Sequence, residues 1–82
     1  MSQHKKLFSK AERNPSGLDF SELHTLMIQC GWVKDRQRGS HQIWYSPKGM
    51  RLSIQMRNGM AKGYQVQQFL SIVKEEGKNE NN

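Results

Sequence analysis

The stretch MRLSIQM, residues 50–56, alternates apolar and polar side chains without a break. Because successive side chains of a β-strand point to opposite faces, this pattern predicts a strand with one apolar and one polar face. The apolar side chains are those of Leu52, Ile54 and Met56, and the polar face includes the cation Arg51. We therefore expect a sheet that covers a core on one side and presents positive charge on the other.

Two further strands are expected before this one. Residues 40–46 contain three β-formers in a row, Ile43, Trp44 and Tyr45, and a Pro-Lys-Gly turn signal at 47–49 separates them from the next strand. Residues 32–36 alternate only roughly. Together the three segments predict an antiparallel meander.

A helix is expected on each side of the strands. The first covers about residues 20–30: Asp19 is a suitable N-cap, Glu22 completes a capping-box pattern, and Gly31 is a natural C-cap. The second runs from residue 62 or 64 to residue 76, just before a glycine. Its apolar stripe at i, i+3, i+4 and i+7 consists of Val66, Phe69, Leu70 and Val73.

This order predicts an α+β domain in which both helices lie on the apolar face of a three-stranded antiparallel sheet. The α-β-β-β-α order is the layout of a double-stranded-RNA-binding domain, a fold that contacts RNA through its shape and phosphates. We assign the domain to residues 15–77. Residues 1–14 are expected to form an N-terminal extension, partly flexible or a short helix, and residues 78–82 a disordered tail.

Positive charge is concentrated in the middle of the chain. The formal net charge is +6, and residues 34–62 hold seven cations against one acid, Asp35. This segment therefore accounts for the whole net charge. Such a concentration suggests a polyanion as partner, either nucleic acid or an acidic protein, with a merely solvated surface as the alternative.

Several classes of protein are disfavoured. No segment approaches the ~18 consecutive apolar residues of a membrane span, and no signal-peptide core follows the first lysines. Cys30 is the single cysteine, which excludes an internal disulfide and suits a reducing cytoplasm. The histidines and acids show no metal-ligand spacing, and no phosphate-binding glycine loop is present, so we expect neither a metal nor a cofactor.

His41 is the candidate catalytic residue. It follows Gly39 and Ser40 at the start of a predicted strand, in basic surroundings. RNA cleavage needs a base for the 2′-hydroxyl proton, a task suited to an imidazole whose pKa is ordinarily near ~6.5, and positive charge to offset the phosphorane. The candidate phosphate contacts are Arg36, Arg38, Arg51 and Lys62.

The direction in which His41 points is open at this stage. Strict alternation places it on one face with Ile43 and Tyr45, while Trp44 points to the other. If Ile43 enters the core, His41 lies at the rim of the buried face and has a structural role. A bulge or tight loop at Gly39 would instead turn the histidine outward.

Two motifs, in order and on suitable elements, carry a resemblance. The first runs from Gly31-Trp32 to Arg36-x-x-Gly39-Ser40-His41, and the second is GMAKGYQVQQFL at 59–70. Over residues 14–74 the chain resembles the HicA (YcfA-like) family, RNA-cleaving toxins of type II bacterial toxin–antitoxin pairs.

The resemblance implies a fold like the double-stranded-RNA-binding domain. It also implies a metal-independent mRNA endonuclease, or mRNA interferase, whose essential histidine matches His41 with Gly39 and Ser40 as its local setting. A cognate HicB-type antitoxin is the implied partner. The chain departs from the family pattern at Gly63, often proline, at Gln67, often arginine, and in the added residues 1–13.

Two other functions remain open. One is a non-catalytic module of the same fold that binds RNA or a protein through the basic face. The other is a degenerate relative kept as a partner for a regulator. Purified protein that shifts RNA in a gel without shortening it would favour the non-catalytic module over the nuclease.

Overall fold

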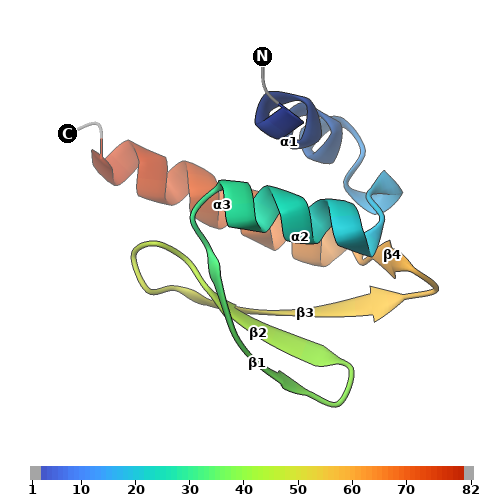
Figure 1. Cartoon of the computed structure of the whole chain (residues 1–82). Helices are drawn as coiled ribbons and strands as arrows, with labels where there is room; N and C mark the ends of the chain where they lie inside the picture. The colour runs from blue at the N-terminus through green and yellow to red at the C-terminus, as the bar shows by residue number, and fades with distance from the viewer. Residues whose placement is uncertain (1–2, 81–82) are drawn as a thin grey trace.

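The computed structural model describes residues 3–80, and the side chains of residues 6–77. The elements in chain order are α1 (Gln3–Arg13), the 3₁₀ helix η1 (Pro15–Gly17), α2 (Phe20–Gln29), β1 (Val33–Arg38), β2 (His41–Tyr45), β3 (Arg51–Arg57), β4 (Met60–Ala61) and α3 (Gly63–Glu80). The strands form one antiparallel sheet in the order β1-β2-β3-β4. Helices α2 and α3 cover one face of this sheet, and α1 lies on the side of these helices away from the sheet (Figure 1).

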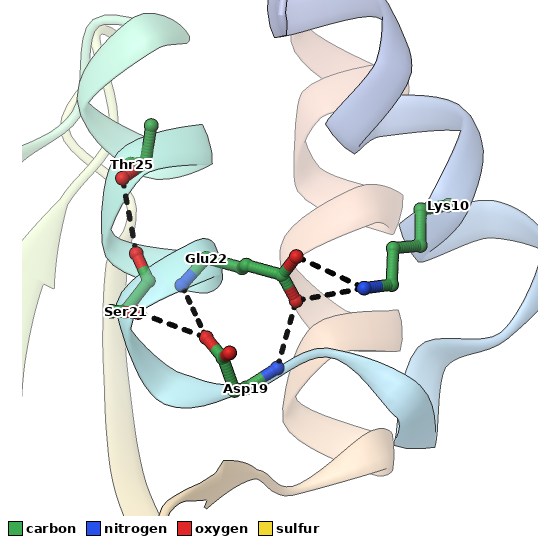
Figure 2. A network of polar contacts seen from close by, with 5 residues as sticks. All are labelled: Lys10, Asp19, Ser21, Glu22 and Thr25. Carbon is green, nitrogen blue, oxygen red and sulfur yellow. Dashed lines mark hydrogen bonds and ion pairs between the residues drawn. The ribbon is translucent and has the colours of Figure 1, made fainter.

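Helix α2 begins with the predicted capping box. The Asp19 carboxylate accepts a hydrogen bond from the Glu22 backbone N–H at 2.9 Å, and the Asp19 N–H donates to Glu22 Oε1 at 3.1 Å. Lys10 of α1 donates to the same Glu22 carboxylate at 2.9 Å (Figure 2). One carboxylate thus caps α2 and holds α1 against it.

The other end of α2 is a Schellman motif built on Gly31. Its φ of +87° is the left-handed conformation that glycine adopts without strain. The Gly31 N–H donates to the Ile28 carbonyl, and the Trp32 N–H donates to the Met27 carbonyl. These two bonds satisfy carbonyls that the helix leaves free and turn the chain into β1.

The sheet has four strands, so the prediction of three was wrong. After β3, Asn58 and Gly59 both have positive φ, 52° and 81°, and the chain returns to pair Met60 with Arg57. A two-residue loop with both residues left-handed is a type I′ hairpin, for which Asn-Gly is the preferred sequence. Strand β4 has only two residues, which is too short to show an alternation.

Helix α3 also ends later than predicted. It continues through Gly77 to Glu80, because a glycine inside a helix costs only about 1 kcal/mol relative to alanine and no proline follows it. Residues 78–80, predicted to belong to a disordered tail, are therefore helical. Residues 81–82 of that tail, and residues 1–2 of the extension, lie outside the described part of the chain.

The core lies between the sheet and the helices. Its largest fully buried side chains include Trp44 from β2, Phe69 from α3 and Ile54 from β3. Gln65 of α3 is buried among them, and its Oε1 accepts the backbone N–H of Gln55 at 2.8 Å. This bond gives the Gln55 N–H an acceptor just beyond the last residue pair of β3 and the short strand β4.

The Gln65 bond gives a stability prediction. Gln65→Met keeps the side chain's size but removes the acceptor, so the free energy of unfolding should fall by about 1–3 kcal/mol in urea titrations. Gln68→Met, at an exposed site of the same helix, is the matched control and should change it by less than about 0.5 kcal/mol. Equal stability of the two variants would contradict this role.

The capping box gives a pH prediction. The Glu22 backbone N–H and the Ser21 hydroxyl donate to Asp19 and lower the pKa of its carboxyl below 3.8. A lowered folded-state pKa contributes stability above pH 3.8 that is lost as the pH falls through the folded-state value. Asn is also a good N-cap, so Asp19→Asn isolates the charge. The wild type should lose stability relative to this variant on acidification below about pH 4, measured by urea unfolding; parallel curves would contradict the prediction.

Candidate active site and nucleic-acid interface

A tight hairpin loop places His41 at the start of β2. Gly39 and Ser40 form a two-residue loop, and Arg38 pairs directly with His41 across it. Only Gly39 has a positive φ, 61°, which is the pattern of a type II′ turn with glycine first. Of the bulge or tight loop predicted at this glycine, the structure has the tight loop, as a two-residue hairpin turn.

His41 points to the sheet face that the helices leave uncovered. Trp44, only 2% exposed, belongs to the main cluster of packed hydrophobic side chains, whereas Ile43, although also buried, lies outside that cluster. Because side chains alternate along a strand, His41, Ile43 and Tyr45 lie on the other face. We call this the open face; its members on β3, paired with these three, are Gln55, Ser53 and Arg51. The imidazole is therefore solvent-exposed and is not a rim residue of the core.

A buried polar cluster helps to fix this orientation of β2. Gln42 Oε1 accepts from Trp44 Nε1 at 3.1 Å and lies 2.7 Å from His24 Nε2. The His24 ring also packs between Phe20 and Trp44, with centroids 4.7 and 5.4 Å away. His24 is thus part of the packing between α2 and β2 and lies on the opposite side of the sheet from His41.

Two groups on β3 lie beside His41. The Ser53 hydroxyl is 3.4 Å from His41 Nδ1, and Gln55 is the direct cross-strand partner of His41. The Gln55 amide donates to Ser40 Oγ at 2.9 Å and its Oε1 accepts from Lys62 Nζ at 2.6 Å. Gln55 therefore links the loop before His41 to the lysine at the start of α3.

The predicted phosphate contacts fall into two groups. Arg38 lies opposite His41, and Lys62 reaches the neighbourhood of His41 through Gln55. Arg36 and Arg51 lie farther along the sheet, across from Ile43 and Tyr45 respectively. All four cations border the open face, but only the first group is next to the imidazole.

Sequence reasoning missed Ser53, Gln55 and Gln65 as parts of the site. Ser53 and Gln55 were assigned to the polar face of β3, but their register with β2 was unknown. The signal for Gln65 is its position four residues before Phe69, which puts a polar side chain on the apolar side of α3. Such a buried amide requires a partner, here the Gln55 backbone.

The remaining reactive groups are not gathered into a site. Cys30 is half-buried at the end of α2, and burial raises the pKa of its thiol, which disfavours the reactive thiolate. Among the side chains of residues 6–77, no three of His, Cys, Asp or Glu are placed to hold a metal ion. None of the helices described here is both long enough and apolar enough to cross a bilayer.

Comparison with known proteins agrees with the sequence resemblance. A family model described as the HicA toxin of bacterial toxin–antitoxin systems matches residues 20–74, from the start of α2 into α3. The match covers about two thirds of the 82-residue chain and leaves α1 and η1 outside it. No curated protein and no solved structure matches the chain. The extent of the family match shows that this chain belongs to the HicA toxin family.

Proposed function

We propose that this chain is the toxin of a type II toxin–antitoxin pair and an endoribonuclease that cleaves mRNA, with His41 as general acid–base. The observation that carries the proposal is the exposed imidazole on the open face, flanked by Arg38 and by the Gln55-held Lys62. Membership of a toxin family supports it independently.

The chemistry follows from these positions. His41 takes the proton of a ribose 2′-hydroxyl, O2′ attacks the adjacent phosphorus, and the bond from phosphorus to O5′ breaks. The products are a 2′,3′-cyclic phosphate and a 5′-hydroxyl, whose proton comes from water or a protonated side chain. Lys62 donates one hydrogen to Gln55 and keeps two for phosphate oxygens, so it can offset charge that develops on the phosphorane.

We also propose that the fold is a variant of the double-stranded-RNA-binding layout with a short fourth strand added at the sheet edge. The order of α2, β1–β3 and α3 supports this relation. In the cell, mRNA in the cytoplasm is the proposed substrate. A toxin of this family implies an antitoxin, and we propose a HicB-type protein whose acidic groups cover the cations of the open face.

The catalytic assignment predicts the behaviour of His41→Ala. Cleavage of single-stranded RNA should fall about 10²- to 10⁴-fold, since a positioned acid–base group contributes about that much. Because the side chain is exposed, circular dichroism and thermal unfolding should stay unchanged, and RNA should still bind in a gel shift. Full cleavage by this variant would exclude His41 as the acid–base group. Wild-type protein that binds RNA but leaves its length unchanged would favour the non-catalytic binding module.

The role of Lys62 can be separated from bulk charge. Lys62→Met should lower kcat by about 10²-fold, because it removes a donor to the charge that develops on phosphate. Lys48→Met removes the same charge from the exposed turn between β2 and β3 and should act only weakly, through binding. Equal losses in the two variants, measured as kcat at saturating RNA, would mean that Lys62 contributes only to the general positive field.

A further inference from the structure

A hollow of about 330 Å³ lies on the open face, beyond His41. Its lining residues are Asp35, Arg36, Arg38, Ile43, Tyr45 and Arg51. We call it the Tyr45 hollow. Ile43 and Tyr45 follow His41 by two and four residues on the same face of β2, roughly 7 and 13 Å along the strand. The hollow therefore adjoins the proposed cleavage site and shares Arg38 with it.

A β-bulge builds one wall of the hollow. The pairing register between β1 and β2 shifts between Lys34 and Arg36, which leaves Asp35 as the extra residue. Asp35 and Arg36 are consecutive, yet both line the hollow, an arrangement that regular alternation forbids. Bulges re-aim side chains in this way and are over-represented beside active sites.

The lining of the hollow is mostly polar, and Ile43 and Tyr45 supply its apolar part. Ile43, on the face away from the helices, is only 5% exposed and so offers little surface to a ligand. Tyr45 beside it is 37% exposed and offers an aromatic surface to solvent. The hollow thus combines one exposed aromatic ring with three guanidinium groups and a carboxylate.

This combination suits a nucleotide better than an isolated phosphate. Guanidinium groups bind phosphate oxygens, and an aromatic ring stacks on any base. The Asp35 carboxylate would weaken a site that bound only anions. A carboxylate does, however, accept hydrogen bonds from the exocyclic amino groups of bases. Arg36 donates to one of its oxygens, Oδ2, at 3.1 Å.

We propose that the Tyr45 hollow is a nucleotide subsite for single-stranded RNA, adjacent to the cleaved bond. This inference rests on the proposed function. The base stacks on Tyr45, Arg51 holds a backbone phosphate, and Asp35 accepts a hydrogen bond from the base's amino group. The subsite requires an unpaired base, because bases inside a duplex stack on one another. It favours adenine, cytosine or guanine over uracil, which has no amino group.

The stacking half of the proposal is tested with oligoribonucleotides that vary the nucleotides on both sides of the cleavage position. Tyr45→Ala should lower kcat/KM by about 5- to 100-fold, mainly through KM. Tyr45→Phe keeps the ring and should stay close to the wild type. Tyr64→Ala removes an exposed tyrosine from the first turn of α3, outside the hollow, and should cause no comparable loss.

The base-selecting half is tested by Asp35→Asn. The preference for an amino-bearing base over uracil should shrink by about 2- to 10-fold at one flanking position. Glu75→Gln removes the same charge at an exposed site of α3 and should leave the preference unchanged. A uniform gain across all oligonucleotides with Asp35→Asn would mean that the carboxylate acts only as charge, which would overturn base selection.

The outcomes separate this inference from the proposed function. If the wild type cleaves RNA but Tyr45→Ala matches it in KM and preference, the subsite is wrong and the nuclease stands. If the wild type binds RNA without cleaving it, the nuclease is wrong, and weaker binding by Tyr45→Ala still supports the subsite. Loss of antitoxin binding with unchanged RNA binding would assign the hollow to a protein interface and overturn the nucleotide subsite.

Discussion

The burial of Trp44 is the constraint on which the rest of this structure depends. Its ring fills the space between β2 and the helices, and its indole N–H requires a buried acceptor, which Gln42 supplies. Once Trp44 points inward, strand alternation puts His41 and Tyr45 on the open face. The residues proposed for chemistry and for base stacking thus owe their exposure to the packing of a side chain on the opposite face of the same strand.

A second set of contacts fixes the side chains at the end of the open face where His41 lies. Gln65 in the core holds the backbone of Gln55, and the Gln55 side chain then joins Ser40 to Lys62. Because Gln65 fixes the backbone of Gln55 and the Gln55 side chain accepts a hydrogen bond from Lys62, the Lys62 side chain has fewer conformations open to it. A lysine on a long flexible stem is a poor electrostatic catalyst unless something holds it, and here the core does so through β3.

Local signals gave most of the fold. The capping box at Asp19, the glycine that ends α2 and the alternation of β3 each depend on neighbours in the chain, so they can be recognised without a structure. The orientation of β2 could not be recognised in this way, because Ile43 and Trp44 are both apolar. Only packing against α2 and α3 determines which of the two points into the core. The contact between Gln55 and Lys62 depends on the hairpin at 58–59, and the two residues of β4 after it are too few to show a strand pattern in the sequence.

The N-terminal extension and Gly63 are connected through η1, which lies between α1 and the rest of the chain. The extension is part of the folded unit: Ala11 of α1 is fully buried, and Glu12 forms an ion pair with Lys74 of α3 at 3.2 Å. It then enters η1, which lies so close to α3 that a Cβ at Gly63 would collide with the Ser16 hydroxyl. A proline there would meet the same obstacle. The absence of a side chain at Gly63 thus lets η1 pack directly against the start of α3, one residue after Lys62.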